Sequence, residues 1–244
     1  MGAMRGMGRR GVLAGAAAAL VGCQQQQPAP VVAPEESVPR LGPNRTGYIG
    51  FQAPILNRSR DLFISGVNQL LAQNAAEIYV LMSSPGGTVD AAQDMIAFVD
   101  KTHAERGVRF TMHNAGVVAS AACYVFLTGQ RRLSAPRGTF LFHQAALVAD
   151  GPITSRTLHE ASDTVRRIER AFLSMLTSRT KLNAAEAASF LHRTVILNAD
   201  EARRDGIVEA ISGFALPQGA NILQIRSVPS AGGTGPARRP EPGA

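Results

Sequence analysis

Hydrophobic and polar residues recur with two different periods between residues 48 and 212. Short apolar runs with the length of a strand occur at residues 47–53, 77–84, 108–114 and 139–145. Segments in which apolar residues recur every three or four positions, as on one face of a helix, occur at residues 59–73, 88–105, 119–129 and 153–180. This alternation predicts an α/β fold with a largely parallel sheet, whose ligands bind at the carboxyl ends of the strands.

The first 22 residues have the pattern of an export signal. A basic start with Arg9 and Arg10 precedes an apolar run from Val12 to Val21, which is too short for an ordinary membrane-spanning helix. The stretch Leu20–Cys23 resembles the lipobox of bacterial lipoproteins, in which cleavage leaves the cysteine lipidated. The paired arginines also resemble a twin-arginine signal. We therefore expect an exported protein, anchored by lipid in the cell envelope on the bacterial periplasmic side.

Composition divides the remaining chain into three parts. Residues 23–45 are rich in Gln and Pro and predict a flexible tether. Residues 46–215 contain all the periodic segments and predict one domain, and a chain of 244 residues with 45% hydrophobic residues can bury its core. Residues 216–244 are rich in Gly, Pro and Ala and predict a disordered tail.

Charge and cysteine content exclude several classes of function. Removal of residues 1–22 takes away three arginines and no acid, so the formal charge falls from +7 to +4. No stripe of Lys and Arg with interleaved aromatic residues marks a nucleic-acid surface. With Cys23 lipidated, only Cys123 remains, so no intramolecular disulfide is expected. No Cys/His spacing is typical of a zinc site, and we predict neither a metal nor a cofactor.

Chemistry-bearing residues follow three of the predicted strands. The stretch "SSPGG" leads from a strand into a helix, Ser120 stands where another strand meets a helix, and His143 ends a third strand. Each feature on its own has an ordinary structural explanation, such as a turn or a helix cap. Together they supply a hydroxyl nucleophile, a base and unobstructed backbone N–H groups, which acyl transfer requires.

Four stretches in this order resemble the proteolytic subunit of Clp proteases (ClpP). They are "SSPGGTVDAA", "AGVVASAACYVF", "FLFHQA" and "LNADEARRDGIVEAI". The resemblance implies the ClpP/crotonase fold of repeated β-β-α units with a long handle-type helix. It also implies serine-type peptidase activity, with Ser120 as nucleophile and His143 as general base. The backbone N–H groups of Gly87 and Ala121 would form the oxyanion hole.

The third member of the catalytic triad differs from the family. Thr194 occupies the position of the family's aspartate, and a neutral oxygen cannot stabilise imidazolium as a carboxylate does. Asp150 and Asp163 are the other candidates for orienting His143, whereas His192 is expected on a helix surface. Two hypotheses follow, a Ser-His dyad hydrolase of modest rate and a catalytically degenerate binding or scaffold lipoprotein.

Two further enzyme classes share this fold. A signal-peptide-peptidase-like protease would use a Ser-Lys dyad, but neither Lys101 nor Lys181 lies in a matching stretch. A crotonase-type hydratase would not need Ser120 and His143 together. Cys123, close to Ser120, is expected to pack in the core and not to act as a nucleophile.

The partners expected are peptides or unfolded protein segments. The chain has no Gly-x-x-x-x-Gly-Lys-Ser/Thr loop, and an exported protein has no ATP supply, so the activity is expected to be ATP-independent. The helix at 153–180 corresponds to the element that the family uses between rings, which favours a homo-oligomer. An unidentified adaptor is a further possible partner.

Overall fold

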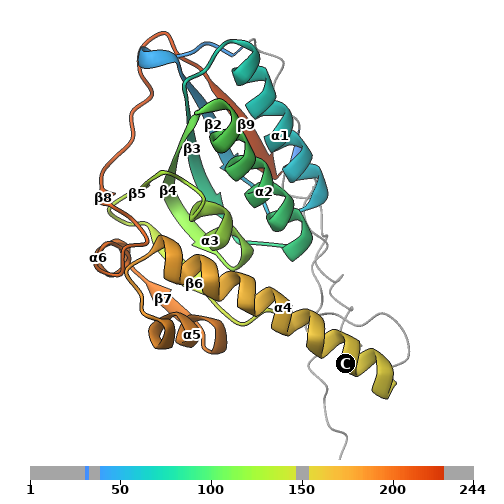
Figure 1. Ribbon diagram of the computed structural model, residues 1–244. Coiled ribbons are helices and arrows are strands. Elements are labelled where there is room, and N and C mark those ends of the chain that lie inside the picture. The colour runs from blue at the N-terminus through green and yellow to red at the C-terminus, as the bar shows by residue number, and fades with distance from the viewer. Residues whose placement is uncertain (1–30, 33–38, 147–153, 228–244) are drawn as a thin grey trace, which may run out of the picture.

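The computed structural model describes residues 31–32, 39–146 and 154–227 (Figure 1). The predicted export signal and Cys23 lie outside these residues. In the described part of the chain, no helix is both long enough and apolar enough to cross a membrane.

Nine strands form one sheet in the described part of the chain. They are β1 (Val31–Val32), β2 (Thr46–Gln52), β3 (Glu77–Ser84), β4 (Arg109–Ala119), β5 (Arg131–Ser134), β6 (Thr139–Phe142), β7 (Val195–Leu197), β8 (Ala210–Ile211) and β9 (Ile222–Ser227). The main order is β1-β9-β2-β3-β4-β5-β8, while β6 pairs with β4 and β7. All pairings are parallel except β1 with β9 and β6 with β7. The predicted α/β fold with a largely parallel sheet is confirmed.

Six helices and one short 3-10 turn accompany these strands in the described ranges. They are η1 (Pro43–Arg45), α1 (Asn57–Ala72), α2 (Val89–Arg106), α3 (Ala121–Phe126), α4 (Ser155–Arg179), α5 (Ala184–His192) and α6 (Ala199–Arg204). Figure 1 shows α1 and α2 side by side over one face of β2, β3 and β9. The sequence of β3 accounts for this packing, because its alternate residues from Ile78 to Ser84 are buried, as expected for one face of a strand covered by other elements.

Local sequence signals set the ends of several helices. Gly107 ends α2 in the left-handed conformation, with φ of 65°. Asn183 caps α5, where its side chain accepts hydrogen bonds from two backbone N–H groups and the Glu186 carboxylate accepts one from the Asn183 N–H. Asn198 and Glu201 form the same kind of reciprocal pair at the start of α6.

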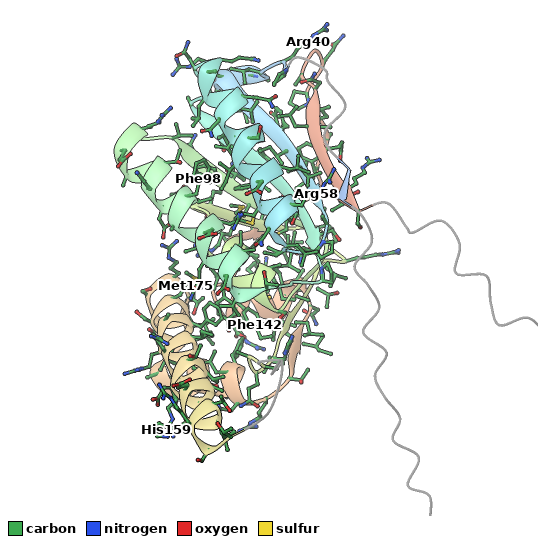
Figure 2. All side chains as sticks on the ribbon, turned by 90° about the vertical axis from the view of Figure 1, so that its right-hand side faces the viewer. Arg40, Arg58, Phe98, Phe142, His159 and Met175 are labelled. Atoms are coloured by element: carbon green, nitrogen blue, oxygen red, sulfur yellow. The ribbon has the colours of Figure 1, made fainter. Side chains whose placement is uncertain are left out.

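The long helix α4 packs along only part of its length. Ile168, Phe172 and Leu176 are buried against the domain, whereas Leu158 is 63% exposed. Figure 1 shows the N-terminal part of α4 extending beyond the sheet, and Figure 2 shows His159 near that far end and Met175 close to the sheet. The predicted apolar face of residues 153–180 is therefore partly core and partly open surface.

Two expectations about the ends of the domain are wrong in part. Strand β9 lies within the predicted disordered tail of residues 216–244, yet it pairs with β2 from Tyr48–Ile222 to Gln52–Arg226. Leu223 and Ile225 are buried in the core, and this burial together with a ladder of backbone hydrogen bonds offsets the entropy of ordering the segment. Strand β1, within the predicted tether of residues 23–45, pairs with β9.

Candidate active site

Ser120 lies at the junction between β4 and α3, in a backbone conformation that is rare for a residue with a side chain. Its φ is 56° and its ψ is −129°. Such a conformation costs about 1–3 kcal/mol and persists where surrounding contacts hold it. One such contact is the backbone N–H of Ser120, which donates to the carbonyl of Leu141 on β6 at 2.7 Å. The Ser120 hydroxyl does not cap α3, and it has no hydrogen bond within the described residues.

A glycine turn after β3 lies directly against this junction. A Cβ added at Gly86 would be 2.6 Å from the Cβ of Ser120 and 3.1 Å from the backbone N of Ala121, and φ at Gly86 is 92°. A Cβ added at Gly87 would be 2.0 Å from the carbonyl oxygen of Ile55. Ile55 holds the turn through two hydrogen bonds, from its N–H to the Gly86 carbonyl and from the Thr88 N–H to its own carbonyl. Glycine is therefore required for this close backbone approach.

His143 follows the last residue of β6, and its side chain is exposed. Its Nδ1 lies 2.8 Å from the carbonyl oxygen of Gln144. A carbonyl accepts but does not donate, so Nδ1 carries a proton in this arrangement, and in the neutral imidazole Nε2 is then the nitrogen with the free lone pair. A general base that acts through Nε2 needs this tautomer. Within the described residues, the ring makes no hydrogen bond to Ser120.

One cavity of about 130 Å³ brings the predicted residues together. Gly87, Ser120, Ala121 and His143 all line it. Ala121 is the first residue of α3, where a backbone N–H has no acceptor within the helix. Residues that carry a hydroxyl, an imidazole and backbone N–H groups thus line one space, an inventory that suits attack on a carbonyl carbon followed by stabilisation of the oxyanion.

A model of the family described as Clp protease matches residues 45–213. The chain belongs to the Clp protease family. It is 27% identical to the ATP-dependent Clp protease proteolytic subunit 3 of Rhizobium etli, over 64% of this chain and 85% of that protein. It is 28% identical to the ATP-dependent Clp protease proteolytic subunit 2 of Gluconobacter oxydans, over 64% of this chain and 75% of that protein.

A solved structure confirms the predicted ClpP-type fold. A single-residue mutant of ClpP1 from Listeria monocytogenes superposes with a TM-score of 0.60, at 18% identity, over 70% of this chain and 92% of that chain. The fold and the family are therefore established together. The roles of the individual site residues remain predictions that rest on their geometry.

Thr194, which the sequence resemblance predicts at the position of the Clp family's aspartate, does not line the cavity. Strands β6 and β7 are antiparallel, with Phe142 opposite Val195, so the next residues along, His143 and Thr194, are neighbours across the two strands. Thr194 is exposed, and it makes no hydrogen bond to His143 in the described part of the structure. The imidazole is held by a backbone carbonyl instead.

The other acids and the histidine considered from sequence lie away from His143 or outside the described residues. Asp150 lies outside the described residues. Asp163 is on an exposed turn of α4, where it pairs with Arg166 at 3.9 Å and lines a different cavity. His192 is exposed at the end of α5, as predicted.

Neither lysine of the alternative Ser-Lys hypothesis reaches the cavity. Lys101 is exposed on α2 and pairs with Glu105 at 3.9 Å, and Lys181 is exposed beside Gly206. Cys123 is 1% exposed, and burial raises the pKa of its thiol well above the usual range. These positions favour Ser120 and His143 over a Ser-Lys dyad or a cysteine nucleophile.

Sequence reasoning missed the backbone contact of His143 and two polar residues of the cavity wall. The carbonyl of Gln144 contacts His143 but does not line the cavity, and because it is a backbone group, no residue type signals it. Tyr124 and Glu169 line the cavity, from α3 and α4. The four-residue spacing from Ser120 could have indicated Tyr124, because residues four apart lie on the same face of a helix. Nothing local points to Glu169, because the packing of α4 on α3 brings it to the site.

Proposed function

We propose that this protein is a serine peptidase that hydrolyses peptides or unfolded protein segments through an acyl-enzyme on Ser120. The single observation that carries the proposal is the cavity, in which the hydroxyl of a strained strand–helix junction meets His143 and the glycine turn. Membership of the Clp protease family supports peptide-bond hydrolysis as the reaction.

The reaction follows from the roles that these groups can fill. The Ser120 Oγ attacks the carbonyl carbon while its proton passes to Nε2 of His143. The backbone N–H groups of Gly87 and Ala121 donate to the oxyanion, a contribution of roughly 3–4 kcal/mol per donor in comparable sites. The intermediate expels the amine, which takes the proton from Nε2. Water then attacks the acyl-enzyme by the same route and releases the acid.

Within the described residues the Ser120 hydroxyl has no hydrogen bond and His143 contacts Gln144, so the His143 ring has to change its orientation before the reaction. His143 must turn so that Nε2 meets Oγ, and catalytic hydrogen bonds often tighten only when substrate binds. We propose a Ser-His dyad in which Nδ1 keeps its contact with the Gln144 carbonyl while the ring turns, so that this carbonyl has the orienting role that a carboxylate fills in a triad.

Covalent labelling tests this function. A fluorophosphonate probe should label the purified protein on a single peptide containing Ser120, and Ser120→Ala and His143→Ala should each abolish the labelling. The matched controls are Ser65→Ala and His159→Ala, which change an exposed serine on α1 and an exposed histidine on α4. A folded protein without labelling would favour the degenerate binding or scaffold protein instead.

We also propose that the protein works without ATP in the cell envelope, anchored by lipid at Cys23. The support is the export pattern and the lipobox resemblance of residues 1–23. The full chain, expressed in bacteria with labelled palmitate, should incorporate the label in the membrane fraction. Cys23→Ala should abolish both incorporation and membrane retention, and unchanged retention would contradict the anchor.

Self-association through α4 is the third part of the proposal, since its N-terminal half extends from the domain and exposes Leu158. A homo-oligomer should appear in light scattering of the purified domain, and Leu158→Glu should weaken it. A monomer at all concentrations would refute this part. An adaptor stays a possible partner that capture experiments with the anchored protein would identify.

A further inference from the structure

A buried tyrosine hydroxyl without a partner lies in the wall of the candidate active-site cavity. Tyr124 is 3% exposed, and its Oη has no hydrogen-bond partner among the described residues. Its ring stacks on Phe172 of α4, with centroids 3.6 Å apart and planes 5° from parallel. Buried tyrosine hydroxyls usually find a partner, so an unpaired one in a cavity wall indicates a missing ligand atom.

A carboxylate without a counter-ion lines the same cavity. Glu169 stands one helical turn before Phe172 on α4, and within the described structure it forms neither a hydrogen bond nor an ion pair. The neighbouring arginines make other contacts: Arg166 pairs with Asp163, Arg167 donates to the Thr164 hydroxyl, and Arg170 donates to the backbone carbonyl of Arg166. All three line a second cavity, which Glu169 also borders. Glu169 is therefore available to a group that enters the cavity.

The two groups act on each other. Burial raises the pKa of the Tyr124 hydroxyl, and the nearby charge of Glu169 raises it further, so the hydroxyl stays protonated. It has one proton to donate and two lone pairs, whereas an ionised carboxylate only accepts. The Glu169 carboxylate is satisfied only by a ligand that brings an N–H or O–H donor, whereas the Tyr124 hydroxyl can accept from such a ligand or donate to it.

The rest of the cavity wall is apolar and narrow. The residues that share this character are Val89, Ala121, Ala145, Phe172 and Leu191. A volume of about 130 Å³ corresponds to roughly four water-sized groups, enough for one unbranched side chain. A ligand side chain with an apolar stem and a hydrogen-bond donor at its tip matches both the apolar lining and the Tyr124–Glu169 pair. Among unbranched side chains that fit this volume, glutamine and lysine have that form.

We propose that Tyr124 and Glu169 form the hydrogen-bond-accepting end of the substrate cavity and select a glutamine or lysine side chain on the residue whose carbonyl Ser120 attacks. This specificity rests on the proposed peptidase function. Tyr124 and Glu169 do not touch the reacting atoms in this assignment. They distinguish substrates by the donor that each side chain carries.

Peptides that differ only at the attacked residue test the assignment. Fluorogenic peptides with Gln, Lys, Met or Leu at that residue are compared by kcat/KM. The wild type should favour Gln and Lys over Met by about tenfold, because a site with buried polar groups rejects a substrate that leaves them unpaired. Tyr124→Phe, which keeps the ring stack on Phe172, and Glu169→Leu should bring the ratios to within about twofold.

The control variant is Glu160→Gln, which changes an exposed glutamate on α4 that pairs with Arg156 and lies outside the cavity. It should leave the ratios unchanged. A wild type that prefers Met or Leu, or unchanged ratios in Tyr124→Phe and Glu169→Leu, would overturn the assignment.

A binding measurement separates this assignment from the peptidase function. In Ser120→Ala, fluorescence anisotropy gives the Kd of labelled peptides whose C-terminal residue is Gln, Lys or Met. Tighter binding of Gln and Lys peptides by about tenfold, lost on addition of Tyr124→Phe, would support the selective cavity even if the wild type cleaves nothing. Cleavage of all peptides with equal Kd values would leave the peptidase function standing and refute the selectivity.

Discussion

Placing an aspartate at residue 194 should accelerate the reaction of Ser120 only modestly. A triad aspartate both fixes the tautomer of its histidine and stabilises the imidazolium, and neutralising it in a serine protease lowers turnover about ten-thousandfold, chiefly through the wrong tautomer. Here the Gln144 carbonyl, 2.8 Å from Nδ1 of His143, already fixes the tautomer. Thr194→Asp therefore adds only the charge interaction.

The size of that interaction follows from the strand pairing. Residue 143 follows Phe142 and residue 194 precedes Val195, so the two lie opposite each other just beyond the antiparallel Phe142–Val195 pair. Facing side chains on neighbouring strands have Cβ atoms roughly 5 Å apart. Opposite charges at about 4 Å interact by about 1 kcal/mol in water and about 4 kcal/mol near a shielded surface. Because both positions are exposed, the lower value applies, which corresponds to about a fivefold change in rate.

The assay is the second-order rate constant of fluorophosphonate labelling at Ser120, which does not depend on a known substrate. Thr194→Asp should raise it about fivefold at low salt and less at high salt, since exposed charges are screened. Thr194→Asn is the matched control, because it has the same shape without the charge, and should change the rate less than twofold. A gain of a thousandfold or more would show that the Gln144 carbonyl does not set the tautomer, and equal gains from Asp and Asn would exclude charge as the cause.

Two further predictions concern the stability of the fold. The Arg132 guanidinium donates to four backbone carbonyls at 2.9–3.3 Å, so Arg132→Met should lower the free energy of unfolding by about 3 kcal/mol in urea titrations, and a loss below about 1 kcal/mol would contradict this role. Burial lowers the pKa of His113, which contacts the Tyr79 hydroxyl at 2.6 Å. The pKa of His113 is lower in the folded than in the unfolded state, so its contribution to the free energy of unfolding is fully present above about pH 6.5 and is lost as the pH falls below that value. His113→Leu should flatten this pH dependence of the free energy of unfolding, measured between about pH 5 and 8.

The parts of the fold that sequence predicted are those with a strong local period. Strand β3 has the predicted bounds of residues 77–84, since its alternate residues face the helices and the opposite face of the sheet. Helix α4 begins and ends within two residues of its predicted limits. In both cases the hydrophobic pattern and the burial agree, so local sequence and tertiary structure favour the same element.

The parts that were missed depend on distant partners. Strand β9 lies between Gly- and Pro-rich stretches that argue for disorder, and it is ordered by pairing with β2 at the other end of the chain. Strands β7 and β8 have three and two residues, too few to show a period. At the site, strand ends pointed to Ser120 and His143. The Gln144 carbonyl reaches His143 through backbone geometry, and Glu169 reaches the cavity through helix packing, so neither has a local sequence signal.

The cavity depends on the position of α4 as much as on the strand ends. Phe172 and Glu169 come from the half of α4 that packs on α3, and the stack of Phe172 on Tyr124 joins the two helices beside Ser120. At its C-terminal end α4 is tied to α2, because Arg179 donates two hydrogen bonds to Asp100 at 2.8 and 3.0 Å. A bidentate pair of charge-assisted hydrogen bonds constrains the orientation of the helix more than a single surface ion pair does. The candidate active-site cavity therefore depends on tertiary contacts of the same helix whose other half extends from the domain.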